Sequence, residues 1–109
     1  MKSTKYYSNR QEKQIAKIVS GKQVVGSGST SFHKGDVKTN NFLIEAKTTI
    51  FTKSSFSIKK AWLLKNKEEA FAMHRPYSAL AFNFGPDEDN YYIIDEKLFK
   101  KLVDFLEQK

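Results

Sequence analysis

Apolar residues recur at steps of three and four in three parts of the chain, and this spacing predicts three helices. The first helix is expected over residues 6–19 and should end at Gly21, which can adopt the left-handed backbone of a helix C-terminus. The second is expected over residues 58–73 and the third over residues 96–106. The predicted N-caps are Ser8, Ser57 and Asp95.

Other apolar residues follow the two-residue alternation of strands. Residues 36–39 and 42–50 flank Asn40-Asn41, which predicts a hairpin because asparagine tolerates the positive φ of a two-residue turn. The run 77–84 (YSALAFNF) is almost continuously apolar and is typical of a buried strand. Further short strands are expected at residues 23–25 and 91–94.

The element order α-β-β-β-α-β-β-α predicts a small α/β or α+β fold, with a mixed central sheet flanked by helices. At 109 residues the chain is long enough for one domain, expected over residues 1–109. No apolar stretch reaches the roughly 20 residues of a membrane span. The polar N-terminus and the absence of cysteine favour a cytoplasmic protein that does not contact membranes.

Positive charge is concentrated in the first two-thirds of the chain. The net charge is +7, yet residues 1–67 hold 14 Lys and Arg against three acids, Glu12, Asp36 and Glu45. Residues 68–109 hold 5 basic residues against 9 acids. Such a division predicts one face that meets a polyanion such as DNA. The alternative is that the lysines only keep the surface soluble.

The hairpin brings the rare acids together. With a two-residue turn, Asp36 lies opposite Glu45, and Lys47 shares the face of Glu45. Two facing carboxylates repel each other, and a divalent cation between them would remove the repulsion. Lys47 could then orient the attacking water or stabilise the transition state. The alternative is an ordinary amphipathic hairpin whose polar face happens to carry these residues.

These residues resemble the PD-(D/E)xK nuclease superfamily, and in particular the small archaeal-type Holliday junction resolvases of DNA recombination. The likeness consists of Gly35-Asp36, the apolar strand that leads into Glu45-Ala46-Lys47, and Glu12 on the first helix. The loop 26–29 (GSGS) adds to it, while Gly35 replaces the proline of the superfamily's name. Small proteins of this kind are common in phages, so action in the cytoplasm of a host cell is expected.

The resemblance implies a restriction-endonuclease-like core and a magnesium site, in which manganese would substitute. Asp36 and Glu45 would bind Mg²⁺, with the carbonyl of Ala46 as a further ligand. Glu12 would assist the metal or its waters, and Lys47 would be the catalytic lysine.

Several polar residues are candidates for DNA contacts, since hydroxyl and amino groups bind phosphate oxygens. Lys59 and Lys60 begin the second helix, where the superfamily often places a further polar residue of the site; ordinary surface lysines are the alternative. The loop residues could equally belong to a simple connector. The loop candidates are Ser27, Ser29, Thr30, His33 and Lys34.

The expected activity is metal-dependent hydrolysis of phosphodiester bonds in DNA, with four-way junctions as the preferred substrate. Resolving a junction takes two paired cuts, which predicts a symmetric homodimer. Trp62 and Phe71 are expected in the core or at the dimer interface. The alternatives are a sequence-specific or nicking endonuclease on duplex DNA, a noncatalytic basic DNA-binding protein, and a structural or inhibitory interaction protein.

Overall fold

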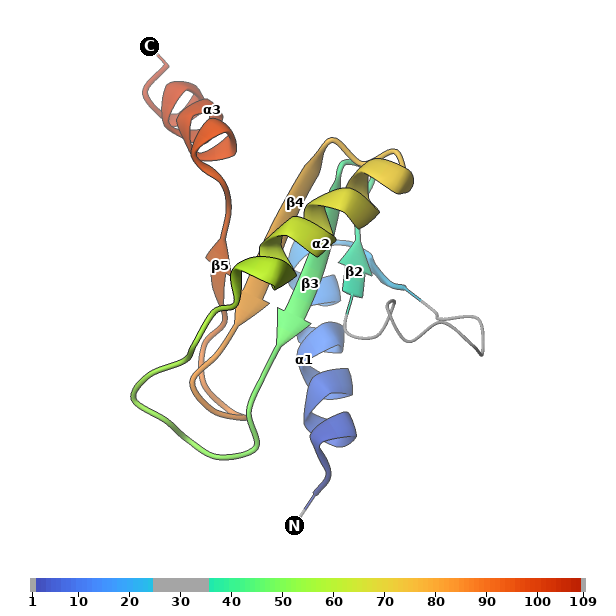
Figure 1. Cartoon of the computed structure of the whole chain (residues 1–109), viewed down its shortest axis with the longest axis vertical. Helices are drawn as coiled ribbons and strands as arrows, with labels where there is room; N and C mark the ends of the chain where they lie inside the picture. Colours follow the sequence, from blue (N-terminus) through green and yellow to red (C-terminus); the bar gives the residue numbers. More distant parts are fainter. Residues whose placement is uncertain (1, 25–35, 109) are drawn as a thin grey trace.

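The computed structural model describes residues 2–24 and 36–108, which form an α+β fold with a mixed sheet (Figure 1). The order of the elements broadly matches the order expected from the sequence, although several bounds differ. The elements are α1 (Thr4–Val19), β1 (Lys22–Gln23), β2 (Asp36–Lys38), β3 (Phe42–Lys47), α2 (Lys60–Ala72), β4 (Tyr77–Phe82), β5 (Tyr91–Ile93) and α3 (Glu96–Leu106).

The sheet has the strand order β1-β2-β3-β4-β5. All neighbouring strands are antiparallel except β3 and β4, which are parallel. Parallel strands need a crossover, and α2 supplies it. Because α2 returns across the sheet, it covers one face of β3 and β4 (Figure 1).

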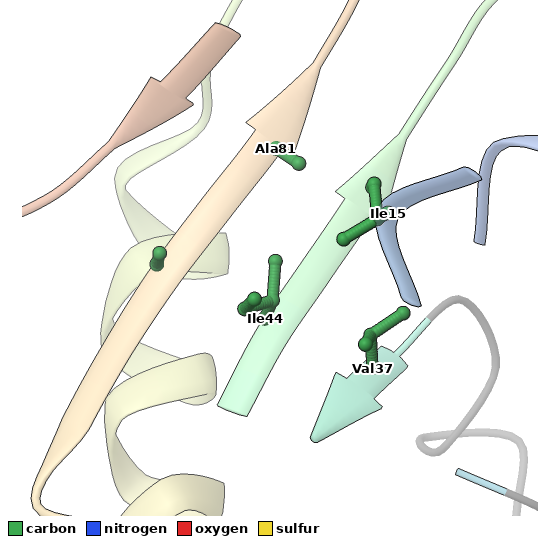
Figure 2. Packing of buried hydrophobic residues seen from close by; sticks show 5 residues of the cluster. Ile15, Val37, Ile44 and Ala81 are labelled. Atoms are coloured by element: carbon green, nitrogen blue, oxygen red, sulfur yellow. The ribbon is translucent and has the colours of Figure 1, made fainter. Parts of the chain in front are cut away.

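The main apolar cluster lies on the opposite face, under α1. Ile15 of α1 is fully buried against Val37 of β2 and Ile44 of β3, and Ala79 and Ala81 of β4 complete the cluster (Figure 2). Leu43 and Leu80 are also fully buried and belong to the face covered by α2, since side chains alternate along a strand. Both faces of the central strands are therefore covered.

The hairpin register is the one that the sequence predicts, but its turn closes differently. Asp36 pairs with Glu45, and Val37 with Ile44. Neither Asn40 nor Asn41 has a positive φ. Instead the Thr39 hydroxyl accepts hydrogen bonds from the backbone N–H groups of Asn41 and Phe42, at 3.3 and 3.0 Å. The side chain of Thr39 thus replaces the left-handed backbone expected of the asparagines.

The first helix ends at Val19, as predicted, but it begins two residues earlier than expected, at Thr4, and its capping residues differ. Ser3, not Ser8, is its N-cap, and the Ser3 hydroxyl accepts a hydrogen bond from the Tyr6 N–H. The left-handed residue at its end is Ser20, with φ 54°. Gly21 has a different role, since a Cβ there would lie 2.6 Å from the Lys38 carbonyl oxygen. Glycine is needed for this close approach to β2.

The second helix begins at Lys60, later than the expected start after Ser57, and its N-cap Lys59 makes no side-chain capping bond. The preceding segment is held against the end of β4 instead. The Lys53 N–H donates to the Phe84 carbonyl at 2.7 Å, and the Phe56 ring lies 5.4 Å from that of Phe82. These contacts keep the chain extended and delay the helix.

The last helix is capped by Asp95, as predicted, through a hydrogen bond from the Leu98 N–H. No residue of α3 is buried, however, so this helix does not contribute to the core as a flanking layer would. In Figure 1 it lies beyond the edge of the sheet, at the upper left. Within residues 2–24 and 36–108, no helix has the length and apolar character needed to cross a membrane.

Candidate active site

The centre of the candidate site is the carboxylate pair of the hairpin. Asp36 and Glu45 face each other in the β2–β3 ladder, and their residues are only 1% and 9% exposed. The sequence suggested a polar outer face for this part of the hairpin, but α2 covers that face. Two carboxylates are therefore held side by side in a largely dry environment.

Burial changes the protonation of Asp36. Loss of solvent and the neighbouring carboxylates of Glu45, Glu69 and Glu12 raise the pKa of Asp36 from 3.8 to about 8, with Lys47 opposing them weakly. One oxygen of the pair, Asp36 Oδ2, is buried without a hydrogen-bond partner among residues 2–24 and 36–108. A buried oxygen in this condition is destabilising unless a cation, a water or a proton satisfies it.

Lys47 lies at the end of β3 and is held from two sides. Its Nζ is 3.0 Å from Glu45 Oε2 and 4.4 Å from the centre of the Trp62 ring on α2. A cation above an aromatic ring is attracted by the ring's quadrupole. Trp62 was expected in the core or at a dimer interface, but it is half-buried and serves to position this ammonium group.

The backbone of Lys47 is fixed by a buried amide network. Gln11 Nε2 of α1 donates to the Lys47 carbonyl at 2.8 Å and to Asn90 Oδ1 at 3.1 Å. Asn83 Nδ2 also donates to Asn90 Oδ1, and the Thr48 hydroxyl donates to Asn83 Oδ1 at 2.8 Å. This network joins α1 to the carboxyl ends of β3 and β4, where Lys47 emerges.

Glu12 lies on α1 beside the edge strand β1. Burial raises its pKa, while a hydrogen bond of 3.2 Å from Gln23 Nε2 lowers it. Its charge contributes to the raised pKa of Asp36, so it belongs to the electrostatic surroundings of the pair. Its role in assisting a metal stays a prediction.

The remaining candidates are divided between described and undescribed parts of the chain. Lys59 and Lys60 are exposed at the start of α2, with Lys59 Nζ 5.8 Å from the Trp62 ring that also contacts Lys47. The small side chain of Ala46 packs against the apolar cluster. The loop candidates Ser27, Ser29, Thr30, His33 and Lys34 lie outside the described residues.

Sequence reasoning missed Glu69, the third carboxylate around Asp36. Glu69 lies on α2, and its charge helps to raise the Asp36 pKa. A signal was present, because Trp62, Asn66 and Glu69 recur at helical spacing and so share one face. Asn66 shows which face this is, since its Nδ2 donates to the carbonyl of Ala79 on β4 at 2.9 Å.

The donor set fits a divalent cation in its chemistry. Mg²⁺ and Mn²⁺ prefer carboxylate oxygens, and Asp36 presents a buried oxygen without a described partner beside a second carboxylate. Residues 2–24 and 36–108 contain no group of three or more His, Asp or Glu side chains already arranged as a cation cage. The pair would accordingly leave several positions of the ion to water or substrate oxygens.

Comparisons with protein-family models, with curated proteins and with solved structures gave no match.

Proposed function

We propose that this protein is a divalent-metal-dependent endonuclease that hydrolyses phosphodiester bonds in DNA. The observation that carries the proposal is the buried pair Asp36 and Glu45. Asp36 Oδ2 has no hydrogen-bond partner among residues 2–24 and 36–108, and Lys47 Nζ lies 3.0 Å from Glu45 Oε2. A fold that needed only stability would not keep this pair, because two neutral side chains would avoid the loss of stability that the raised pKa of Asp36 causes at neutral pH.

Asp36 and Glu45 would hold Mg²⁺ or Mn²⁺, with the Ala46 carbonyl as a further ligand. Such an ion, when bound, polarises a phosphate and lowers the pKa of a coordinated water. The protein's own part is to keep the two carboxyl groups together and away from bulk water, since Asp36 and Glu45 are only 1% and 9% exposed. Asp36 must lose its proton to act as a ligand, so cation binding at neutral pH should release a proton.

Lys47 would act on the phosphate or on the attacking water. Its ammonium group is held between Glu45 Oε2 and the Trp62 ring, which restricts the side chain to the vicinity of the pair. A fixed positive charge stabilises the negative charge that develops on a phosphate during hydrolysis. The Gln11 bond to the Lys47 carbonyl fixes the strand end from which this side chain extends.

The basic part of the chain supports DNA as the substrate. Residues 1–67 carry a balance of +11, and exposed Lys59 and Lys60 lie next to Trp62 in the chain. We propose four-way junctions as the preferred substrate and a restriction-endonuclease-like arrangement of the fold. Both follow from the resemblance of Asp36, Glu45, Ala46 and Lys47 to the resolvases, together with a helix before the hairpin and a crossover helix after it.

The test is cleavage of end-labelled four-way junctions and of linear duplex of the same arms, in Mg²⁺, in Mn²⁺ and in EDTA. Wild type should cut only with a metal, whereas Glu45→Gln and Lys47→Ala should bind DNA without cutting it. Lys65→Ala is the matched control, because it removes one exposed lysine from the outer side of α2.

Cleavage in EDTA, or undiminished cleavage by Glu45→Gln or Lys47→Ala, would refute the proposed site. Binding that persists in EDTA with no cleavage under any condition would indicate a noncatalytic DNA-binding protein. Equal cutting of junction and linear DNA would leave the nuclease in place and remove the preference for junctions.

A further inference from the structure

The last helix presents a continuous apolar face that residues 2–24 and 36–108 leave exposed. Apolar residues recur along α3 so that, at about 100° per residue, they span roughly 160° of its circumference. Every one of them is at least partly exposed, and Phe105 and Leu106 are 69% and 66% exposed. The apolar residues of this face are Leu98, Phe99, Leu102, Val103, Phe105 and Leu106.

A groove of about 960 Å³ lies beside this helix. One wall is the end of α1, with Ile18 and Val19, and the other is formed by Leu98 and Leu102 of α3. The sheet residues Ile44 and Ala79 also line it, on the face where α1 packs. The groove is therefore apolar along these residues, whereas Lys22, Lys38 and Arg75 line it elsewhere. Ile18 is 78% exposed.

Together the exposed parts of α3 and of Ile18 amount to on the order of 500–700 Å² of apolar surface, at about 150–200 Å² for each fully exposed large side chain. The largest apolar patch of a typical soluble monomer measures about 300–600 Å², so this sum lies at or above the upper end of that range. A standard protein interface buries about 800 Å² on each partner. The helix face and the adjoining groove together come close to this area.

We propose that two copies of this chain associate through α3, with the helix of each copy lying along the groove of the other. A twofold axis makes this arrangement reciprocal, since each chain carries both the apolar helix and the apolar groove. Leu98 and Leu102 face the chain's own groove, whereas Phe99, Phe105 and Leu106 remain to meet the partner. This inference stands independently of the proposed nuclease activity.

The charges of α3 favour a second copy over a lipid surface or DNA. The helix carries Lys97, Lys100 and Lys101 against Glu96 and Asp104, and Asp95 precedes it, so the segment 95–106 is neutral overall. Helices that lie on anionic membranes carry an excess of lysine and arginine on their polar side. The groove of the partner is lined by Lys22, Lys38 and Arg75, and a neutral helix lying along it adds no net repulsion between two chains of charge +7.

The test is sedimentation velocity on the full chain over a wide concentration range, roughly 1 to 300 µM, where interfaces of this size associate. Wild type should be a dimer at the upper end, and both Phe99→Glu and Phe105→Glu should raise the dimer dissociation constant at least about tenfold. Lys97→Gln is the matched control, since it lowers the charge by one unit on the polar side of α3 and should leave the dimer intact.

Circular dichroism of each variant shows whether the monomer still folds, and the milder Leu106→Gln provides a second variant on the same face. A wild-type chain that stays monomeric throughout the range would overturn the proposal. So would a dimer that none of the α3 variants weakens. Flotation of a monomeric protein with phosphatidylcholine–phosphatidylserine vesicles would also overturn it, by assigning the same face to a membrane.

Discussion

Replacing Asp36 with asparagine removes a buried ionisable group while keeping the size and shape of the side chain. The pKa of Asp36 rises from 3.8 to about 8 on folding, because the carboxyl is buried and is surrounded by Glu45, Glu69 and Glu12. Between these two values the native state holds a proton that the unfolded state has released. Stability in that window must therefore fall as the pH rises.

The magnitude follows from the size of the shift. One pKa unit corresponds to about 1.4 kcal/mol, so the Asp36 carboxyl contributes a slope of up to about −1.4 kcal/mol per pH unit between pH 4 and 8. At pH 7 the free energy of unfolding is therefore lower, by at most about 4 kcal/mol, than it would be with a side chain that does not titrate. Asp36→Asn should match wild type near pH 4 and be more stable by up to this amount at pH 7.

The assay is urea unfolding of wild type and Asp36→Asn at several pH values, in EDTA, with Trp62 fluorescence as the probe. The free energy of unfolding is plotted against pH for each protein. The difference between the two plots gives the contribution of Asp36, since other groups with shifted pKa values, such as Asp95, are present in both proteins. The predicted result is a difference that grows with pH and levels off above about pH 8. Parallel curves would refute the raised pKa, and a variant less stable than wild type at pH 7 would refute the repulsion.

Three further predictions concern the groups that support the site. Ile44→Ala should lower the free energy of unfolding by about 2–5 kcal/mol in urea titrations, because Ile44 is 3% exposed in the apolar cluster; an effect near zero would contradict the packing under α1. Gln11→Ala should lower the free energy of unfolding by about 1–3 kcal/mol, since it leaves buried partners such as the Lys47 carbonyl without a donor. The same variant should cleave DNA more slowly, while its DNA binding in gel shifts is unchanged. Equal loss of binding and cleavage would show that Gln11 acts only on the fold. Trp62→Leu removes the ring under Lys47 Nζ and with it a cation–π interaction of about 0.5–2 kcal/mol. The cleavage rate in single-turnover assays should fall by roughly tenfold. An unchanged rate would show that the ring does not position the lysine.

Some local features were predicted from the sequence, although the N-caps expected at Ser8 and Ser57 were wrong. The spacing of Asp36, Glu45 and the two asparagines predicted the register of β2 and β3, because a two-residue turn leaves one pairing. The means of closing that turn was not predicted, since the Thr39 hydroxyl offers an acceptor that competes with a left-handed backbone. Asp95 was identified as a cap because capping involves only the next three residues.

Features that depend on distant parts of the chain were not predictable in this way. Periodicity shows which face of the hairpin is polar, but it does not show that α2 packs on β3 or that Asp36 is buried. For the same reason Glu69 was not recognised. Phe71 was expected in the core or at a dimer interface, and its exposure of 83% excludes the core of this chain. The apolar face of α3 was evident from its spacing, yet spacing does not reveal what that face contacts.

The central claim is that the Asp36–Glu45 pair exists to hold a divalent cation. The most direct measurement is calorimetric titration of Mn²⁺ into the protein at pH 7, in two buffers that differ in ionisation enthalpy. With a pKa of about 8, Asp36 carries its proton at pH 7 in the free protein. We predict binding of one ion with release of about 0.9 proton, and loss of that release in Asp36→Asn. The absence of binding, or binding without proton release, would contradict the claim.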